Sequence, residues 1–249
     1  MSSFTETGHA KNVANFEDLI SFCTGYGATY NPVNVNIKIP ALNSKYTACV
    51  NAILAVKVAK TAFDNSTNSR ELVFASLKKL STRVVNALEA TTAAKVTVDD
   101  AKTVNRKIQG KRASKVPEEP SDGGGTGAEA PVKTISVSQQ SYDSLIDHFI
   151  KLIQIVSTEP LYLPNETDLK VVTLNALLVS LKAANTSVIG TTTSYSNSRI
   201  TRDSALYDVT TGMVDLAFEV KAYVKSLYGA GSMQYKQVSG LKFTKIKHS

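Results

Sequence analysis

The chain contains an internal repeat, and this feature constrains its fold more than any other. The stretch YNPVNVNIKIPALN (30–43) returns as YLPNETDLKVVTLN (162–175), with Tyr, Pro, Lys and Leu-Asn in matching places 132 positions later. The same offset aligns Phe63 with Tyr195. Because an internal repeat determines the architecture before any local pattern does, we expect a tandem duplication.

The similarity extends to both sides of this stretch. Upstream, NFEDLI (15–20) resembles SYDSLI (141–146), and downstream NRKIQGKR (105–112) resembles YKQVSGLK (235–242). The predicted organisation is a polar N-terminal leader (1–14), a first helical repeat (15–114), a linker (115–133) and a second helical repeat with a basic C-terminal tail (134–249).

Apolar residues within each repeat follow a helical period. One stripe consists of Leu77, Leu80, Val84, Val85 and Leu88, and its counterpart of Leu216, Val220, Tyr223, Val224 and Leu227. This spacing places the side chains on one face of a 3.6-residue helix. The predicted fold class is all-α: a duplicated unit of three to four helices, forming one helical bundle or two packed bundles.

One stretch of the first repeat departs from this pattern. Residues 33–39 (VNVNIKI) alternate apolar and polar side chains as a half-buried strand does, whereas their partners, NETDLKV, resemble the start of a helix. Equivalent places in a duplicated fold should agree. We therefore expect an extended lead-in followed by a long helix.

The segment between the repeats is rich in proline, glycine and acidic residues. Its sequence, KVPEEPSDGGGTGAEAPVK (115–133), offers little apolar area to bury and predicts a flexible linker. A phosphate-binding loop is disfavoured, because GGGTG is not followed by Lys-Ser or Lys-Thr.

The excess positive charge lies in two segments, 102–115 and 236–249. The ten cations of these segments exceed the net charge of the whole chain, +7, so the remaining residues carry a net charge of −3. They are Lys102, Arg106, Lys107, Lys111, Arg112, Lys115, Lys236, Lys242, Lys245 and Lys247. Such clusters can contact a polyanion such as nucleic acid, or an acidic protein partner. The alternative is a pair of solvated helix ends whose cations complement the helix dipole.

No pattern of residues predicts catalysis or metal binding. The three histidines and two cysteines lack metal-ligand spacing, and neither a nucleophile elbow nor a Walker sequence occurs. We expect no catalytic residues, no metal site, no cofactor and no small-molecule substrate. The matched pairs Arg70-Glu71 and Arg202-Asp203 are the most distinctive polar positions, and we expect them to form equivalent structural ion pairs between helices.

Neither a secretory signal nor a membrane span is predicted. The N-terminus is polar and lacks an apolar core, and no apolar run reaches the roughly 20 residues that cross a bilayer. The expected location is cytoplasmic, with leaderless export as the alternative.

Several long stretches carry a resemblance to a known family. They are GHAKNVANFEDLISFCTGYGATYNP, RVVNAL, KTVNRKIQGKR, ISVSQQSYDSLIDHFIKLI, SNSRITRDSALY and VKAYVKSLYGAGSMQYKQVSGLKF. Together they resemble an uncharacterised family of hypothetical proteins from Bacteroidetes bacteria, over almost the whole chain except the linker. The resemblance implies a bacterial, mostly helical, duplicated protein and supplies no functional residues.

These observations favour a non-enzymatic structural, scaffolding or interaction protein. A duplicated body offers two similar surfaces, which suits bridging a protein partner or self-association. The alternative is a nucleic-acid-associated protein that contacts phosphates through segments 102–115 and 236–249.

Overall fold

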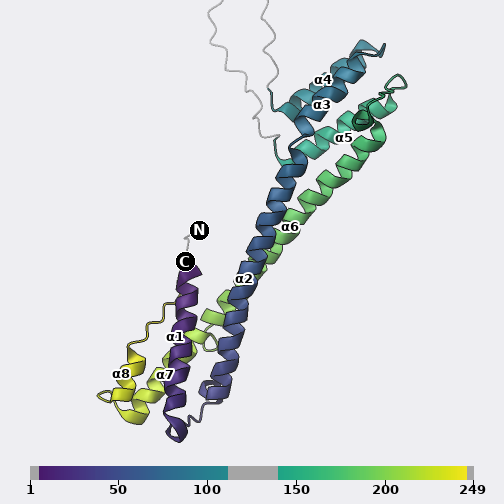
Figure 1. The fold of residues 1–249 in the computed structure, drawn as a ribbon. Coiled ribbons are helices and arrows are strands. Elements are labelled where there is room, and N and C mark those ends of the chain that lie inside the picture. The colour runs from purple at the N-terminus through teal and green to yellow at the C-terminus, as the bar shows by residue number, and fades with distance from the viewer. Residues whose placement is uncertain (1–5, 112–139, 246–249) are drawn as a thin grey trace, which may run out of the picture. The chain divides into compact units, whose positions relative to one another are not determined.

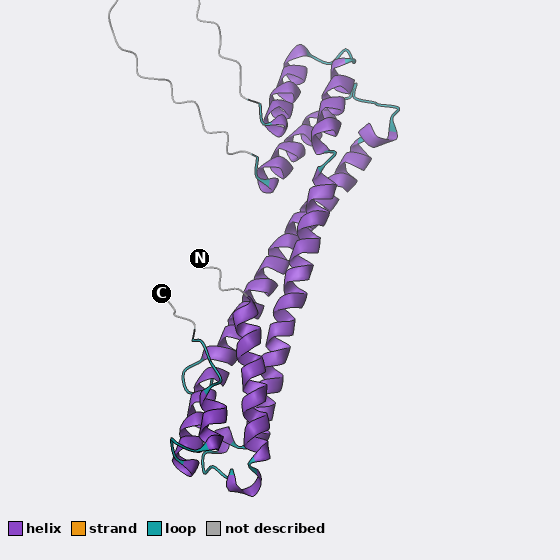
Figure 2. Cartoon of the chain, turned by 60° about the vertical axis from the view of Figure 1, so that its left-hand side comes forward, coloured by secondary structure: helices purple, strands orange, loops and turns teal. Residues whose placement is uncertain are grey.

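A computed structural model describes residues 6–111 and 140–245, and every regular element in these ranges is helical (Figures 1 and 2). The α-helices are α1 (Glu6–Gly25), α2 (Ile39–Phe74), α3 (Leu77–Glu89), α4 (Lys95–Gln109), α5 (Tyr142–Thr158), α6 (Val171–Tyr207), α7 (Met213–Tyr228) and α8 (Met233–Ser239). Three short 3-10 turns are η1 (Gly27–Thr29), η2 (Val35–Ile37) and η3 (Thr167–Leu169). The all-α fold class is confirmed, whereas the predicted linker lies outside the described residues.

The chain divides into two compact units. Unit 1 contains residues 1–64 and 190–249, and unit 2 contains residues 65–189. The boundaries fall within α2 and α6, so each long helix begins in one unit and ends in the other. Each compact unit therefore takes residues from both of the predicted repeats, 15–114 and 134–249.

The core of unit 1 forms where α1 packs on α7 and α8. Phe16, Leu19 and Leu42 are fully buried, and Val220 and Val238 meet them from the other end of the chain. α1 ends at Gly25, and Gly229 follows α7 with φ +87°. This φ value is one that glycine adopts without the steric cost that a Cβ atom imposes.

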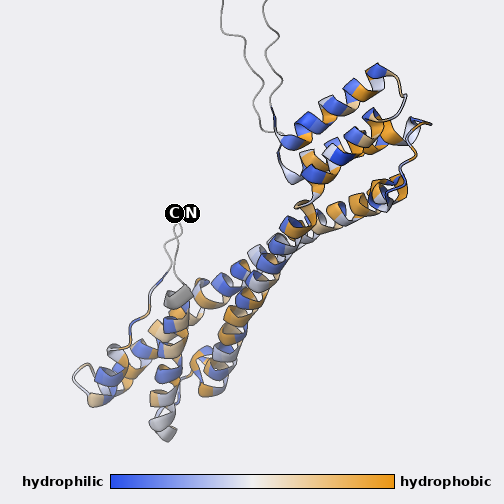
Figure 3. Ribbon diagram, turned by 45° about the horizontal axis from the view of Figure 1, so that its top comes forward, coloured by the Kyte–Doolittle hydropathy of each residue, from blue (hydrophilic) through white to orange (hydrophobic). Residues whose placement is uncertain are grey.

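The core of unit 2 forms where α5 packs on α3 and α4. Phe149 and Leu152 of α5 are fully buried against Leu88 and Ile108. Helix α3 buries one face and exposes the other, as expected from the 3.6-residue period of its sequence. Figure 3 shows the same interleaving of hydrophobic and hydrophilic residues along the helices.

The lead-in to each long helix is a 3-10 turn and not a strand. Residues 35–37 form η2 before α2, and residues 167–169 form η3 before α6. Asn34 caps η2, because its side-chain oxygen accepts a hydrogen bond from the backbone N–H of Asn36 at 3.0 Å. The alternation in VNVNIKI thus reflects one buried residue, Ile37, flanked by exposed neighbours.

One described helix, α6, is long and apolar enough by length and composition to cross a membrane. Asn185 lies in this helix, is buried, and hydrogen bonds to Asp143 of α5 within unit 2. Helices of globular proteins pass the same test, so the finding is weak evidence for a membrane span.

Candidate interaction site

A loop between α5 and α6 in unit 2 is held by one buried tyrosine. Tyr162 is 4% exposed, and its hydroxyl donates a hydrogen bond of 2.9 Å to the carbonyl of Leu169. Burial raises the pKa of Tyr162 to about 12, so the hydroxyl keeps its proton at neutral pH. The bond fixes the two ends of the loop around a buried ring.

The tip of this loop exposes apolar side chains. Leu161 is 48% exposed and Leu163 is 83% exposed, although Tyr162 between them is buried. Pro164 follows and restricts the backbone conformation of Leu163. An anchored loop with an apolar tip costs little conformational entropy on binding, which suits recognition of a partner.

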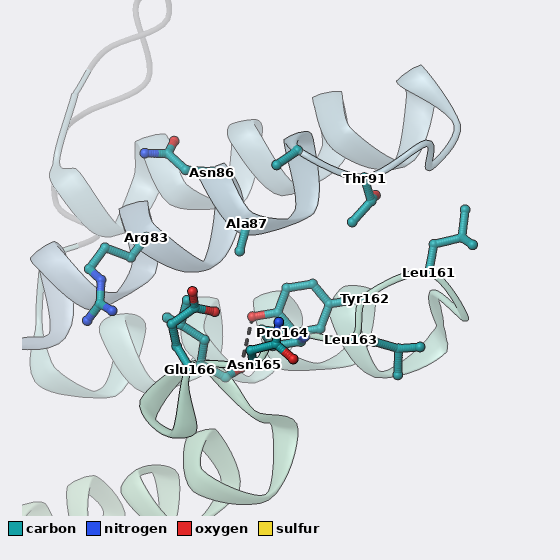
Figure 4. A pocket seen from close by; sticks show the side chains of 12 residues that line it. Arg83, Asn86, Ala87, Thr91, Leu161, Tyr162, Leu163, Pro164, Asn165 and Glu166 are labelled. Atoms are coloured by element: carbon teal, nitrogen blue, oxygen red, sulfur yellow. Dashed lines mark hydrogen bonds between the residues drawn. The ribbon is translucent and has the colours of Figure 1, made fainter.

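A hollow of about 610 Å³ separates this loop from α3. Figure 4 shows Arg83 and Ala87 of α3, and Thr91 just after its end, facing the loop that carries Tyr162 and Glu166. The lining contains both apolar side chains, such as Leu161 and Leu163, and polar ones, such as Asn86.

An ion pair closes one end of the hollow. The guanidinium of Arg83 donates to the carboxylate of Asp168 through both terminal nitrogens, with Nη2 and Oδ1 3.3 Å apart. The hydrogen bond from Arg83 lowers the pKa of Asp168 below its ordinary value. Beyond the pair lies a second hollow of about 360 Å³, which Lys79 and Leu177 help to line.

Unit 1 contains a loop of the same construction. Tyr30 is 7% exposed, and its hydroxyl donates a 2.7 Å hydrogen bond to the carbonyl of Ile37. Val33 is 95% exposed and Val35 is 64% exposed on the same loop. The two bonds span the same seven-residue separation and join residues that the repeat aligns.

The basic residues of segment 102–115 take several different positions in unit 2. Lys102 pairs with Glu89 of α3 at 2.5 Å, while Arg106 and Lys107 occupy the last turn of α4, where cations favour the helix dipole. Lys111 is exposed, whereas Arg112 and Lys115 lie outside the described residues.

The basic residues of segment 236–249 belong to unit 1. Lys245 pairs with Asp215 of α7 and lies 5.6 Å from the centre of the Phe218 ring. Lys236 and Lys242 are exposed, and Lys247 lies outside the described residues. Two of the candidate cations, Lys102 and Lys245, thus form ion pairs within the chain. Binding of nucleic acid by these segments stays a prediction.

The two candidate ion pairs take different forms. Arg202 donates to Asp203 from Nε at 2.9 Å and from Nη2 at 2.8 Å, but both residues belong to α6. Arg70 lies 4.0 Å from the centre of the Tyr142 ring and hydrogen bonds to Asn185 at 3.0 Å. Glu71 is exposed, and within the described ranges the structure does not bring it into an ion pair with Arg70.

Both cysteines and His148 are buried. Burial raises the pKa of the Cys23 thiol to about 12 and that of Cys49 to about 11, which suppresses the reactive thiolate form. His148 is 6% exposed, and neither ring nitrogen has a hydrogen-bond partner. Among the residues that the structure describes, no group of three or more His, Cys, Asp or Glu could hold a metal ion.

Sequence reasoning noted Tyr30 and Tyr162 only as markers of the repeat. A sequence signal for their role as loop anchors was present. Each tyrosine is followed seven residues later by an aliphatic residue, Ile37 or Leu169, which is buried in the structure. The pairing of Arg83 with Asp168 had no such signal, since it joins residues 85 positions apart.

No protein-family model, curated protein or solved structure matches the chain. The geometry of the two anchored loops therefore carries the functional argument.

Proposed function

We propose that the chain is a non-enzymatic structural, scaffolding or interaction protein that arose by tandem duplication and self-associates through its anchored loops. The proposal includes membership of the bacterial family that the sequence resembles and a cytoplasmic location. One observation carries it. In each unit a buried tyrosine bonds to a backbone carbonyl and holds a loop whose apolar tip is exposed.

Matching burial at aligned positions supports the duplication. Leu42 and Leu174 are both fully buried, as are Cys49 and Leu181 further along the long helices. The order of helices agrees too, because each copy runs through a helix, a long helix preceded by a 3-10 turn, and two shorter helices, although the first copy has the additional turn η1. Matching side-chain environments are expected when two copies keep one fold.

The apolar loop tips favour a protein partner over a small substrate. Val33 and Leu163 are exposed to water at 95% and 83%, and transferring such side chains into an interface contributes about 1.5–3 kcal/mol each. Two similar loops in one chain allow bivalent contact, which strengthens weak single contacts. A second copy of the chain carries the same pair of loops and is the partner that we propose.

The test is the oligomeric state of the intact chain. Light scattering and sedimentation velocity over a hundredfold concentration range should show reversible oligomers. The double variant Val33→Asp, Leu163→Asp should shift the association to at least tenfold higher concentration. The control is Val96→Asp, Val179→Asp, which changes two exposed valines outside the loops. A chain that remains monomeric at the highest concentration would refute self-association.

A further inference from the structure

Residues 112–139 connect the two described ranges of the chain, 6–111 and 140–245. Each of these ranges contributes residues to both cores. We call residues 6–111 the first half-chain and residues 140–245 the second half-chain. In unit 1, Phe16 and Leu42 of the first half-chain share one core with Met213 and Val220 of the second. In unit 2, Leu77, Val84 and Ile108 share a core with Phe149 and Leu174. Neither core is complete within one half-chain.

Most aromatic contacts also join the first half-chain to the second. Of the six aromatic pairs among the described residues, five join the first half-chain to the second. They include the edge-to-face contacts of Tyr30 with Tyr223 in unit 1, at 5.3 Å, and of Phe74 with Tyr142 in unit 2, at 4.7 Å. Such pairs each contribute about 0.5–1.5 kcal/mol beyond the burial of their area.

Polar contacts also cross between the half-chains. In unit 1, Asn12 both donates to the carbonyl of Thr244 at 2.9 Å and accepts from its N–H at 3.0 Å. In unit 2, Arg70 bonds to Asn185, and Arg83 pairs with Asp168. These bonds give the association a defined register, because each requires specific partners on both sides.

A separated half-chain would leave apolar helix faces uncovered. Helix α1 packs on α7 and α8, and α5 packs on α3 and α4, so both helices depend on the other half-chain. Isolated helices of this length are marginal in water without tertiary packing. Each half-chain therefore needs a partner to bury Phe16 or Phe149.

We propose that the two half-chains are each other's binding partners, and that they assemble both units without a covalent connection between them. A half-chain from a second copy of this protein fits the same surface equally well. The association of the half-chains depends on packing inside the molecule. It holds whether or not intact chains self-associate.

The test uses the full chain with a cleavable insertion. A site-specific protease sequence with Gly-Ser spacers is inserted between Gly124 and Gly125, and the protein is purified intact and then cut. The fragments should co-elute as one 1:1 complex that keeps the helical circular dichroism of the uncut chain.

Thermal unfolding gives the decisive second readout. Cutting converts an intramolecular association into a bimolecular one, so Tm should fall and should rise with protein concentration. Both the cut and the uncut protein carry Val33→Asp and Leu163→Asp in this measurement, which removes self-association through the loops, and the uncut protein should then show no such concentration dependence. Fragments that elute separately would overturn the proposal. So would a Tm of the cut protein that does not depend on protein concentration.

A buried charge should weaken the cut complex selectively. Phe149→Asp should release the fragments after cutting, whereas Val179→Asp should leave them associated, because Val179 is exposed. Because a charge at the buried position of Phe149 also disturbs folding, the milder Phe149→Leu provides a third variant. It should raise the concentration at which half of the cut complex dissociates by at least tenfold, and an unchanged midpoint would contradict the proposal.

Discussion

Units 1 and 2 each contain one tyrosine-anchored loop but surround it with different side chains. Both bury a tyrosine that bonds to a backbone carbonyl, Tyr30 in unit 1 and Tyr162 in unit 2. Around this common anchor, unit 1 has an edge-to-face contact with Tyr223, whereas unit 2 has the exposed ion pair of Arg83 with Asp168. The comparison indicates that the buried anchors define the fold, while the polar contacts around them vary.

The largest difference in stability between the units should come from buried positions that are aligned in the repeat but hold side chains of different size. Phe149 of unit 2 is aligned with Cys23 of unit 1, and the two are 0% and 1% exposed. Phe149→Ala should lower the free energy of unfolding by about 3–5 kcal/mol, because it leaves a large cavity. Cys23→Ala removes a single heavy atom and should cost about 1 kcal/mol.

Urea denaturation of the two variants measures this contrast. Hydrogen exchange should locate the loss in α5 for Phe149→Ala and in α1 for Cys23→Ala. Equal costs for the two substitutions would contradict the prediction that the larger buried side chain contributes more to stability.

The tyrosine anchors should respond alike if they are equivalent. Tyr30→Phe and Tyr162→Phe each keep the buried ring but leave the carbonyl of Ile37 or Leu169 without its hydroxyl donor. Each change should cost about 1–2 kcal/mol. Hydrogen exchange should rise in the loop of the altered unit only, and a loss confined to one of the two variants would break the proposed correspondence.

The periodic stripes predicted the helices well where apolar residues recur on one face. The stripe from Leu77 to Leu88 corresponds to α3 (Leu77–Glu89), and the stripe from Leu216 to Leu227 corresponds to α7 (Met213–Tyr228). The ends of α2 and α6 were not predictable, because their apolar residues spread over several faces.

The sequence pattern could not identify the partners of each buried face. Periodicity predicts that Val84 and Val220 lie on buried helix faces, but nothing in it states that α3 packs on α4 and α5 or that α7 packs on α1 and α8. For the candidate site, the repeat marked both tyrosines, while the contact of Arg83 with Asp168 depends on tertiary structure.

A smaller difference should appear at acid pH, because unit 2 has His148 where unit 1 has Phe22. Burial lowers the pKa of His148, and the nearby Lys107 and Lys151 lower it further, against a weaker opposing effect of Asp147. The unfolded chain therefore binds a proton at a higher pH than the folded chain. Stability is complete above the ordinary histidine pKa of about 6.5 and falls as the pH drops from there toward the lower pKa of the folded state.

His148→Phe should remove this component of the pH dependence. Hydrogen exchange of α5 at pH 7.5 and pH 5.5 measures it, with the variant expected to differ less between the two conditions than the parent chain. Peptides of α1 around Phe22 provide the internal comparison. An identical pH response of α5 in parent and variant would show that His148 does not contribute.

The smallest effect should come from the exposed ion pair beside the loop of unit 2. Arg83→Gln removes the charge that lowers the pKa of Asp168, but exposed pairs contribute little because water and salt screen them. The stabilising interaction is present above the ordinary aspartate pKa of about 3.9 and is lost as the pH falls through the lower folded value.

In unit 1 the corresponding loop has a hydrogen bond of 3.0 Å between Asn34 and Glu219, which involves only one charged partner. Unfolding midpoints of Arg83→Gln and Glu219→Gln should therefore stay close to that of the parent chain. Only the difference caused by Arg83→Gln should shrink as NaCl is raised from 50 mM to 1 M, a range over which the screening length falls to about 3 Å. A large, salt-independent loss for Arg83→Gln would instead assign this pair a structural role comparable to that of the tyrosine anchors.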